Sequence, residues 1–263
     1  MLDLTAAAAD SVSWGVFTWS GDFTMLDLIA ATTNALNGAL LARRPDHYKN
    51  FTVVGILLMA LIGGMTGGVV RDLILMDVPS AFTNPAYIAL CLVAGVIGYF
   101  IAYTNGEMFR EGLFQFVCSF SLPWFAIVGA SAAISAGLPI SGALVLAVIS
   151  AVAGRYLIDL TCGVPPKLFI QGEWFVVAAL LTAVAWIACD AAGMSAWASA
   201  SIAVVIGFSF RLTALYRGWE EPLAKEPAGV YVHSNGRPLL GRKLQGKSER
   251  EIASLGLGVD PKH

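Results

Sequence analysis

Long apolar stretches separated by short polar connections dominate this chain. A helix needs about 20 apolar residues to cross a bilayer. The segments that approach this length are 23–42, 51–70 with a continuation to about 75, 85–103, 113–136, 140–160, 174–192 and 194–215. The pattern predicts an all-α membrane protein with about seven transmembrane helices.

The composition agrees with a membrane protein. Hydrophobic residues make up 57% of the chain and charged residues 13%, whereas soluble domains carry about 25% charged residues. The net charge of −2 gives no basic signature for nucleic acid. The 4 cysteines lie in apolar stretches and show no CxxC spacing. None of the 3 histidines lies in an apolar stretch. We therefore expect no metal site and no cofactor. We also expect no enzyme, since we find no nucleophile–base set, metal-ligand spacing or phosphate loop.

Changes in composition along the chain divide it into three regions. Residues 1–22 form an N-terminal segment whose only charged side chains are acids, without the Lys/Arg-rich start of a signal peptide. Residues 23–219 form the membrane domain. Residues 220–263 are polar and charged and predict a mostly disordered tail, with one short helix around 248–255.

Loop charges predict the orientation. Basic residues follow the first, third, fifth and seventh apolar segments: Arg43, Arg44, Lys49, Arg110, Lys167 and Arg217. Cytoplasmic loops are enriched in Lys and Arg. We therefore expect the N-terminus outside and the C-terminal tail in the cytoplasm.

A weak internal repeat is visible. A shift of 86 residues places Val78-Pro79 on Val164-Pro165 and Gly68 on Gly154. The repeats cover about 23–103 and 113–192, and each contains three spans. Because three is odd, the second copy enters the membrane from the opposite side, which predicts a 3+3 inverted repeat followed by a seventh helix at about 194–215.

Four glycines in the second span stand directly before a charged pair, Arg71-Asp72. Gly63/Gly67 and Gly64/Gly68 form overlapping GxxxG pairs. One interpretation is close helix packing. The other is a kink or unwound turn that breaks the helix in mid-membrane and exposes carbonyls to a water path.

The charged pairs leave two interpretations open. Arg71-Asp72 is either an interfacial pair that snorkels to water or a buried pair that borders a pore. The second repeat also places charges beside its glycine, because Arg155 follows Gly154 and Asp159 lies one turn later. This i,i+4 spacing predicts a pair on one helix face.

The first span carries a polar stripe. Asp27, Asn34 and Gly38 fall on one helical face. An acid inside a membrane is a functional candidate, although Asp27 could also cap the helix near the outer headgroups. The fourth span has no corresponding acid, and Pro123 predicts a kink there.

Several short stretches together resemble a known family. They are Leu26-Asp27-Leu28-Ile29, Asn37-Gly38-Ala39-Leu40, the run 67–73, Val78-Pro79 and the ending Arg211-Leu212-Thr213-Ala214-Leu215. Over about residues 23–222 the chain resembles the bacterial glycine-transporter-like domain family, the prokaryotic relatives of the trimeric intracellular cation channels.

The resemblance implies a homotrimer in a bacterial inner (plasma) membrane, with one pore per protomer that passes monovalent cations, mainly potassium. It also implies that the second and fifth helices are bent at their glycines. The second half departs from the family pattern. With the shift of 86 residues, Leu157 stands at the family's arginine position and Ile158 at its aspartate position, and Cys118 stands where the family tends to carry an acid.

Three functions remain open at this point. In a channel, Thr66 and Asp72 could offer oxygens to a cation, while Arg71 and Arg155 would have to be paired or act as a gate that responds to voltage or lipid. In a transporter of a small zwitterion such as glycine, Arg71 would bind the carboxylate and Asp27 the amine. In a structural protein the glycines would only pack helices. The candidate pore and gating residues are Gly63, Gly64, Thr66, Gly67, Gly68, Arg71, Asp72, Gly154, Arg155, Asp159, Asp27 and Asn34.

Overall fold

The computed structural model describes most of the apolar region and little of the two ends. The described residues are 12–14, 17–19, 21–41, 51–104, 107–166, 168, 174–219, 231–233 and 257–259. The chain divides into two units, Met1–Glu221 and Pro222–His263. Most of the predicted N-terminal segment 1–22 and tail 220–263 lies outside the described residues.

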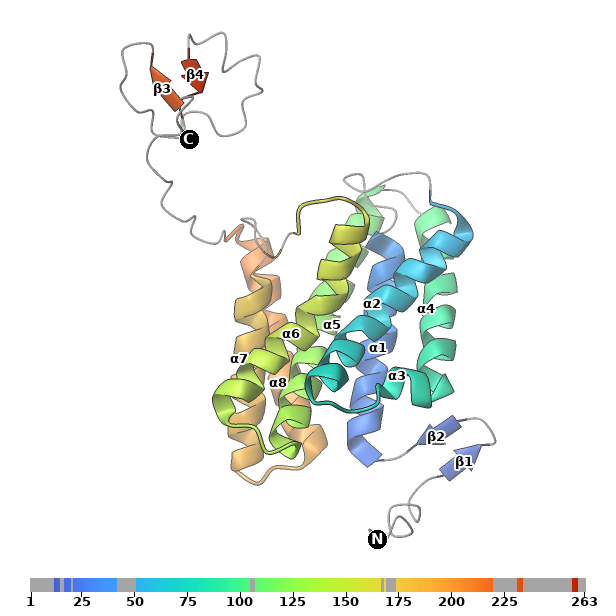
Figure 1. Ribbon diagram of the computed structural model, residues 1–263, viewed down its shortest axis with the longest axis vertical. Coiled ribbons are helices and arrows are strands. Elements are labelled where there is room, and N and C mark those ends of the chain that lie inside the picture. The colour runs from blue at the N-terminus through green and yellow to red at the C-terminus, as the bar shows by residue number, and fades with distance from the viewer. Residues whose placement is uncertain are drawn as a thin grey trace. The chain divides into compact units, whose positions relative to one another are not determined.

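Helices account for almost all of the described structure (Figure 1). They are α1 Gly21–Leu41, α2 Val53–Ile74, α3 Ser80–Thr83, α4 Pro85–Thr104, α5 Glu107–Ser135, α6 Ile140–Thr161, α7 Phe175–Ala191 and α8 Ala196–Tyr216. Each of the seven expected segments coincides with one long helix. The fourth begins earlier than predicted, at Glu107, and the single-turn helix α3 was not predicted.

Two short antiparallel pairs complete the described elements. β1 Val12–Trp14 pairs with β2 Phe17–Trp19 just before α1. β3 Tyr231–His233 pairs with β4 Leu257–Val259 in the C-terminal unit, within the segment that the sequence predicted to be mostly disordered.

Four of the described helical segments are both long and apolar enough to cross a membrane: α2, α6, α8 and the stretch Gly112–Ser135 of α5. Residues Pro85–Ile101 of α4 and the whole of α7 are shorter apolar helices. The polar residues of α1, among them Asp27 and Asn34, lower its hydropathy. Length and composition therefore identify four spans outright, and the remaining helices join them through packing.

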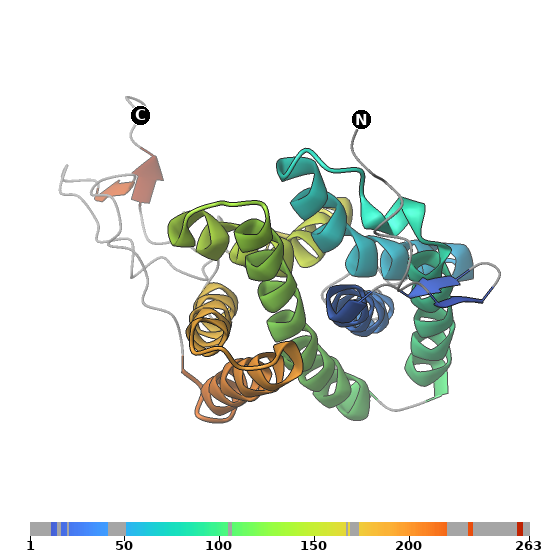
Figure 2. The ribbon, with the colours of Figure 1, turned by 90° about the horizontal axis from the view of Figure 1, so that it is seen from below.

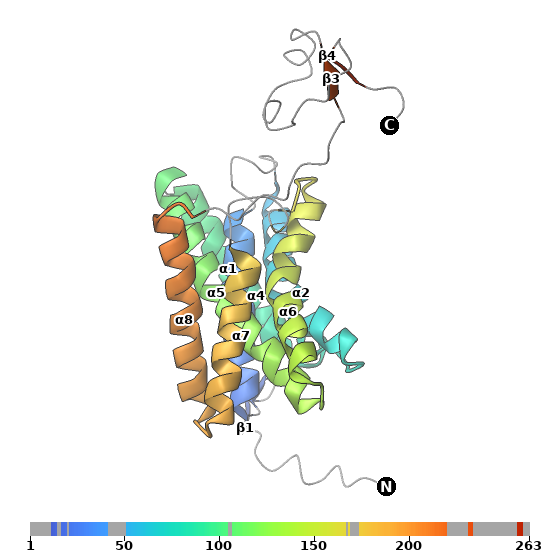
Figure 3. The same cartoon turned by 90° about the vertical axis from the view of Figure 1, so that its left-hand side faces the viewer.

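The long helices alternate in direction along the bundle (Figure 1). α5 runs opposite to α1, so the two halves are inverted relative to each other, as predicted. α1 packs against α2 and α4, α5 packs against α6 and α7, and the pairs α1–α5 and α2–α6 join the halves. Viewed along the bundle, α1 lies between α4 and α5 (Figure 2). The last helix, α8, lies beside α7 (Figure 3) and also contacts α5.

The structure corrects the register of the repeat. α2 and α6 have the same length, and both their first and their last residues are 87 positions apart. Their buried positions follow the same offset, since Gly67, Arg71 and Asp72 correspond to Gly154, Ile158 and Asp159. The predicted shift of 86 is therefore wrong within these helices. It arose because the connection from helix end to Val-Pro is one residue shorter after α6 than after α2.

The glycines of α2 do not break the helix. The helix is continuous from Val53 to Ile74, so the unwound turn considered from the sequence does not form. A Cβ atom at Gly64 would lie 2.6 Å from the Ala31 carbonyl oxygen and the same distance from the Cys91 sulfur. Gly63, Gly64 and Gly67 let neighbouring helices approach closely, which is the packing interpretation. α6 is likewise continuous, and a bend within either helix stays a prediction.

The two halves cross at a reciprocal contact. A Cβ atom at Gly67 would collide with the carbonyl oxygen of Ser150, and one at Gly154 would lie 2.6 Å from the carbonyl oxygen of Gly63. Gly67 and Gly154 are equivalent under the offset of 87, and so are Gly63 and Ser150. α2 and α6 therefore meet about a pseudo-twofold axis, with glycine pressed against backbone on both sides.

Candidate functional site

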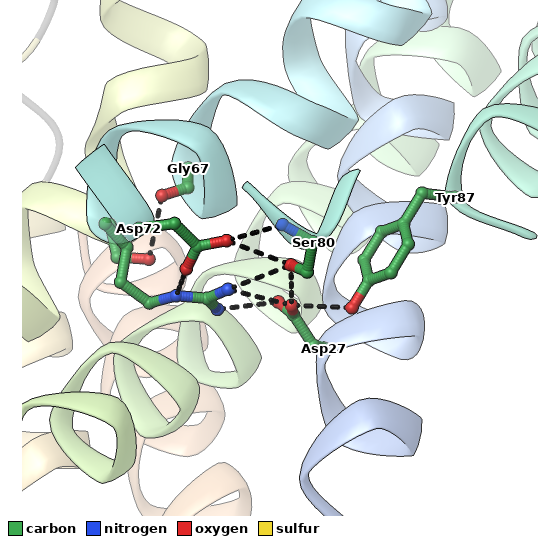
Figure 4. Close-up of polar contacts among 7 residues, drawn as sticks. Asp27, Gly67, Asp72, Ser80 and Tyr87 are labelled. Carbon is green, nitrogen blue, oxygen red and sulfur yellow. Dashed lines mark hydrogen bonds and ion pairs between the residues drawn. The ribbon is translucent and has the colours of Figure 1, made fainter. Parts of the chain in front are cut away.

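A buried ion cluster joins α1 and α2 in the first repeat (Figure 4). The Arg71 guanidinium donates from its two terminal nitrogens to the two carboxylate oxygens of Asp27, at 2.9 and 3.0 Å. Its Nε donates to Asp72 Oδ1 at 2.6 Å. Arg71 and Asp27 are each 1% exposed. The predicted Arg71-Asp72 pair is thus buried, and Asp27 is a partner in it rather than an exposed helix cap.

The connection between α2 and α4 completes this cluster. Ser80, the first residue of α3, donates from its backbone nitrogen at 2.9 Å and from its hydroxyl at 3.0 Å to Asp72 Oδ2. The Ser80 hydroxyl also accepts from Arg71 at 3.3 Å. Tyr87, in the first turn of α4, donates its hydroxyl to Asp27 Oδ2 at 2.7 Å. We call these five residues, Asp27, Arg71, Asp72, Ser80 and Tyr87, the first-repeat cluster.

The cluster has an excess of negative charge. Two carboxylates face one guanidinium, and Ser80 and Tyr87 are neutral. Removing one member of a buried ion pair generally costs about 3–5 kcal/mol, because the partner charge is left without compensation. The Phe23 ring lies 5.3 Å from the Arg71 guanidinium carbon and closes another side of this cation.

A cavity of about 620 Å³ opens onto the first-repeat cluster, and we call it the vestibule. Its walls come from the start of α1, the end of α2, the α2–α3 connection and the end of α5. The lining residues are Phe23, Arg71, Asp72, Leu75, Asp77, Val78, Ser80, Ala132, Ser135 and Ala136. Two acids and one arginine line it, so its charged lining also has an excess of negative charge.

The second repeat has a related but altered cluster. Arg155 Nε donates to Asp159 Oδ1 at 3.0 Å, which is the predicted i,i+4 pair, and Asp159 is fully buried. Under the offset of 87, Asp159 stands at the position of Asp72, Ile158 at that of Arg71, and Arg155 at that of Gly68. The aspartate has kept its place, whereas the arginine lies one turn earlier.

The first and fourth long helices are also equivalent, with a different offset. Gly38 contacts the backbone of Met59 and Ala60, and Gly129, 91 residues later, contacts that of Leu146 and Ala147. The same offset places Phe114 at the position of Phe23. Both rings lie 5.3 Å from an arginine, Phe114 from Arg155 and Phe23 from Arg71. Cys118 accordingly stands at the position of Asp27, so no carboxylate is available there.

The last long helix contributes to the second repeat. Arg211 of α8 is 1% exposed and lies 3.7 Å from the centre of the Phe175 ring. Its Nε donates to the Ser119 hydroxyl at 3.1 Å, and a terminal nitrogen lies 3.6 Å from the Cys118 sulfur. An arginine from outside the repeat thus reaches the position where the first repeat has Asp27.

Asn34 connects three helices near the crossing of α2 and α6. Its side-chain nitrogen donates to the Gly63 carbonyl oxygen at 2.9 Å, and its oxygen accepts from the Ser121 hydroxyl at 3.2 Å. The Ser150 hydroxyl donates to the Gly67 carbonyl oxygen at 3.3 Å. Asn34 therefore belongs to the contact between the halves, not to the first-repeat cluster.

The other predicted site residues divide between packing and charge. Gly63, Gly64, Gly67 and Gly154 lie in close helix contacts, whereas Gly68 faces the first-repeat cluster with room to spare, because a Cβ atom there would be 3.7 Å from Arg71. Thr66 is half-buried on α2, and among the described hydrogen bonds it makes none to the cluster.

Sequence reasoning missed Ser80, Tyr87 and Arg211 as site residues. Arg211 stands within the last apolar segment. An arginine inside a membrane helix is a functional candidate, because placing its charge in the bilayer costs free energy. Ser80 and Tyr87 gave no such signal, because serine and tyrosine are ordinary residues at the ends of membrane helices.

Comparison with known proteins finds similar membrane proteins. A family model described as glycine transporter matches residues 24–103 and 116–191, which are the two repeats. The chain is 29% identical over 157 residues to a UPF0126 membrane protein of Deinococcus radiodurans, covering 59% of this chain and 70% of that protein. It is 23% identical over 167 residues to UPF0126 membrane protein YvgT of Bacillus subtilis, covering 62% and 80% respectively.

Solved structures share the fold. A TRIC trimeric intracellular cation channel orthologue from Rhodobacter sphaeroides matches with a TM-score of 0.66 and 29% identity, over 74% of this chain and 98% of that one. A prokaryotic TRIC channel solved in 0.5 M KCl matches with a TM-score of 0.67 and 19% identity, over 74% and 96%.

Proposed function

The chain belongs to the glycine transporter family, and from this premise we propose that it is a cation channel of the TRIC type. In finer terms, we propose a homotrimer in a bacterial inner membrane, with a pore in each protomer that passes monovalent cations, mainly potassium. The observation that carries the proposal is the vestibule, which ends on a buried cluster with two carboxylates for one arginine.

The charge of this region supports cation passage. Asp72 and Asp77 line the vestibule, and Asp27 lies directly behind Arg71. Clefts lined by one sign of charge and walled by low-dielectric material raise the local concentration of the opposite ion. Arg71 itself does not repel a cation strongly, because two acids neutralise it.

The same hydrogen bonds argue against glycine transport. An arginine side chain has five N–H donors, and Arg71 makes four hydrogen bonds within the chain, to Asp27, Asp72 and Ser80. A zwitterion's carboxylate would have to displace these partners, and its amine would meet an Asp27 already bound by Arg71 and Tyr87. A purely structural role is also disfavoured, because helix packing does not require buried charges.

The solved neighbours support the same class. The R. sphaeroides protein, at 29% identity, is an orthologue of the trimeric intracellular cation channels. The chain is accordingly a membrane transport protein and not an enzyme. We extend this likeness to trimer formation and potassium preference in the present chain.

Single-channel recording of the purified protein in planar bilayers tests the proposal. With potassium as the only permeant cation, we expect unitary currents whose reversal potential follows the potassium gradient. Saturable glycine uptake into liposomes without such currents would instead support the transporter. Chromatography with light scattering measures whether the protein is a trimer.

A charge variant links the current to the vestibule. Asp77 is exposed and lines the vestibule, so Asp77→Asn should lower potassium conductance at low salt. The effect should fade at 1 M salt, where the Debye length is about 3 Å. Asp190→Asn is the matched control, because Asp190 is an exposed acid outside the vestibule lining. It lies in the last turn of α7, which ends at the same end of the bundle as α2 and α5 (Figure 1). Equal effects of the two variants would contradict the vestibule as the cation entrance.

A further inference from the structure

Asn34 and Phe125 occupy equivalent positions on α1 and α5. They are 91 residues apart, the offset that also relates Gly38 to Gly129. Each covers the glycine of a helix in the other repeat. A Cβ atom at Gly154 would lie 3.3 Å from the Asn34 side-chain nitrogen, and one at Gly67 would lie 2.9 Å from the Phe125 ring. At positions related by the repeat, the first half thus has an amide and the second half a phenyl ring.

Phe125 lies beneath the vestibule. On α5 it stands two turns before Ala132, and on α2 its neighbour Gly67 stands one turn before Arg71; Ala132 and Arg71 both line the vestibule. With a rise of about 1.5 Å per residue, the ring is about 10 Å deeper than Ala132. The ring is 1% exposed and packs against Gly67, so an apolar side chain lies between α5 and α2 one turn below Arg71.

The equivalent position in the other half is polar. The Asn34 amide spans Gly63 and Ser121 through two hydrogen bonds, at 2.9 and 3.2 Å. Its oxygen accepts from the Ser121 hydroxyl, and the hydroxyl of Ser150 binds Gly67, one turn along α2 from Gly63. Amide, hydroxyl and carbonyl oxygens are the groups that replace water around a monovalent cation in a channel.

We propose that Phe125 is the apolar plug that closes the vestibule at its floor, and that Asn34 supplies the polar oxygen past which a monovalent cation moves once the ring is displaced. An apolar constriction stops ions because water leaves it, whereas an amide oxygen compensates an ion for lost hydration. The assignment rests on the proposed cation channel and names the two residues that control its narrowest section.

Labelling tests the plug without using current. A membrane-impermeant thiol reagent is added from the vestibule side, which a reactive Ala132→Cys variant identifies. Ser121→Cys places a thiol one turn deeper than Phe125 on α5, at a residue that is 1% exposed and bound to Asn34. We expect this thiol to react slowly with Phe125 present and several-fold faster in the Phe125→Ala background. Mass spectrometry locates the label, with buried Cys91 as an internal reference.

Two variants separate a plug from general loss of packing. Ile127→Ala removes an equally buried side chain from a different face of α5, and it should leave the labelling of Ser121→Cys slow. Phe125→Val, a milder truncation, should give an intermediate rate and replaces Phe125→Ala if that variant does not fold. If the Ser121→Cys thiol reacts at the same rate with the intact Phe125 ring and with the truncated side chain, the plug is overturned.

Current recordings complete the test. Phe125→Ala should raise the potassium current several-fold. Asn34→Leu should lower the current, because both equivalent positions, 34 and 125, then carry apolar side chains. Absence of current in every variant, together with faster labelling in Phe125→Ala, would contradict the channel and leave the plug standing. Normal current in the unmodified protein that neither substitution changes would overturn the inference and leave the channel standing.

Discussion

Asp72 and Asp159 stand at equivalent positions near the ends of α2 and α6, and each accepts a hydrogen bond from the Nε of an arginine, at 2.6 and 3.0 Å. The arginines themselves are not equivalent. Arg71 is the neighbour of Asp72 in sequence and also binds Asp27, whereas Arg155 lies one turn before Asp159. The repeat has preserved an acid at the helix end and changed how its charge is balanced.

The Arg155–Asp159 pair should show coupling in a double-mutant cycle. Either single substitution, Arg155→Ala or Asp159→Ala, leaves a buried charge and should cost about 3–5 kcal/mol of unfolding free energy. The double variant should recover part of this loss. Thermal unfolding in detergent measures it, and effects that add within about 0.5 kcal/mol would show that the residues act independently.

Asp27 should matter more than the tyrosine that binds it. Asp27→Asn removes a charge that compensates Arg71 and should destabilise the protein by about 3–5 kcal/mol. Tyr87→Phe removes one hydrogen bond and should cost about 1 kcal/mol. The second repeat has Phe175 in the first turn of α7, where the first repeat has Tyr87 in α4. Similar unfolding temperatures for the two variants would contradict the prediction that Asp27 contributes more to stability than Tyr87.

Adjacent glycines of α2 should respond differently to alanine. Gly67→Ala forces α2 away from Ser150 and should cost about 1–3 kcal/mol, as overpacking usually does. Gly68→Ala has room beside Arg71 and should leave stability unchanged or raise it. Unfolding temperature and oligomer yield measure the difference. Gly129 is an unsuitable neutral control, because a Cβ atom there would lie 2.9 Å from the backbone of α6.

Met76 should be replaceable by glycine with a gain in stability. Its φ is 59°, whereas the described helix ends at Gly137, Gly163 and Gly193 place glycine in this left-handed conformation. A side chain there costs about 1–2 kcal/mol, and the flexibility of glycine in the unfolded chain offsets part of the gain. Met76→Gly should therefore add about 0.5–1 kcal/mol, and Gly163→Ala should do the reverse. A lower unfolding temperature for Met76→Gly would contradict this.

The two ends of the chain should face opposite compartments. α1 begins and α8 ends at opposite ends of the bundle (Figure 1), and the basic loops predict that the C-terminal side is cytoplasmic. Reporter fusions after Asp3 and after Lys262 should therefore report outside and cytoplasm respectively. Reports from a single compartment would be incompatible with an odd number of spans.

The sequence predicted the helices well because length and hydropathy are local properties. Every expected segment became one helix, and the i,i+4 pair of Arg155 and Asp159 needed only the helical period. The partner of Arg71 could not be predicted in the same way, because Asp27 is 44 residues away and its approach depends on how α1 rotates against α2. The shift of 86 failed for a related reason, since one residue lost from a connection is invisible to a motif comparison.

The members of the first-repeat cluster all lie between Asp27 and Tyr87. The second repeat is completed only by Arg211, which is 124 residues further along the chain than Tyr87. At a synthesis rate of about 5–20 residues per second, the ribosome needs on the order of ten seconds to cover that distance. Throughout this interval the first half has all the members of its cluster, whereas Ser119 and Phe175, which are made within the interval, meet Arg211 only at its end. A chain truncated before α8 would therefore lack Arg211 and leave the second repeat incomplete. Its first repeat would still contain every residue of the first-repeat cluster.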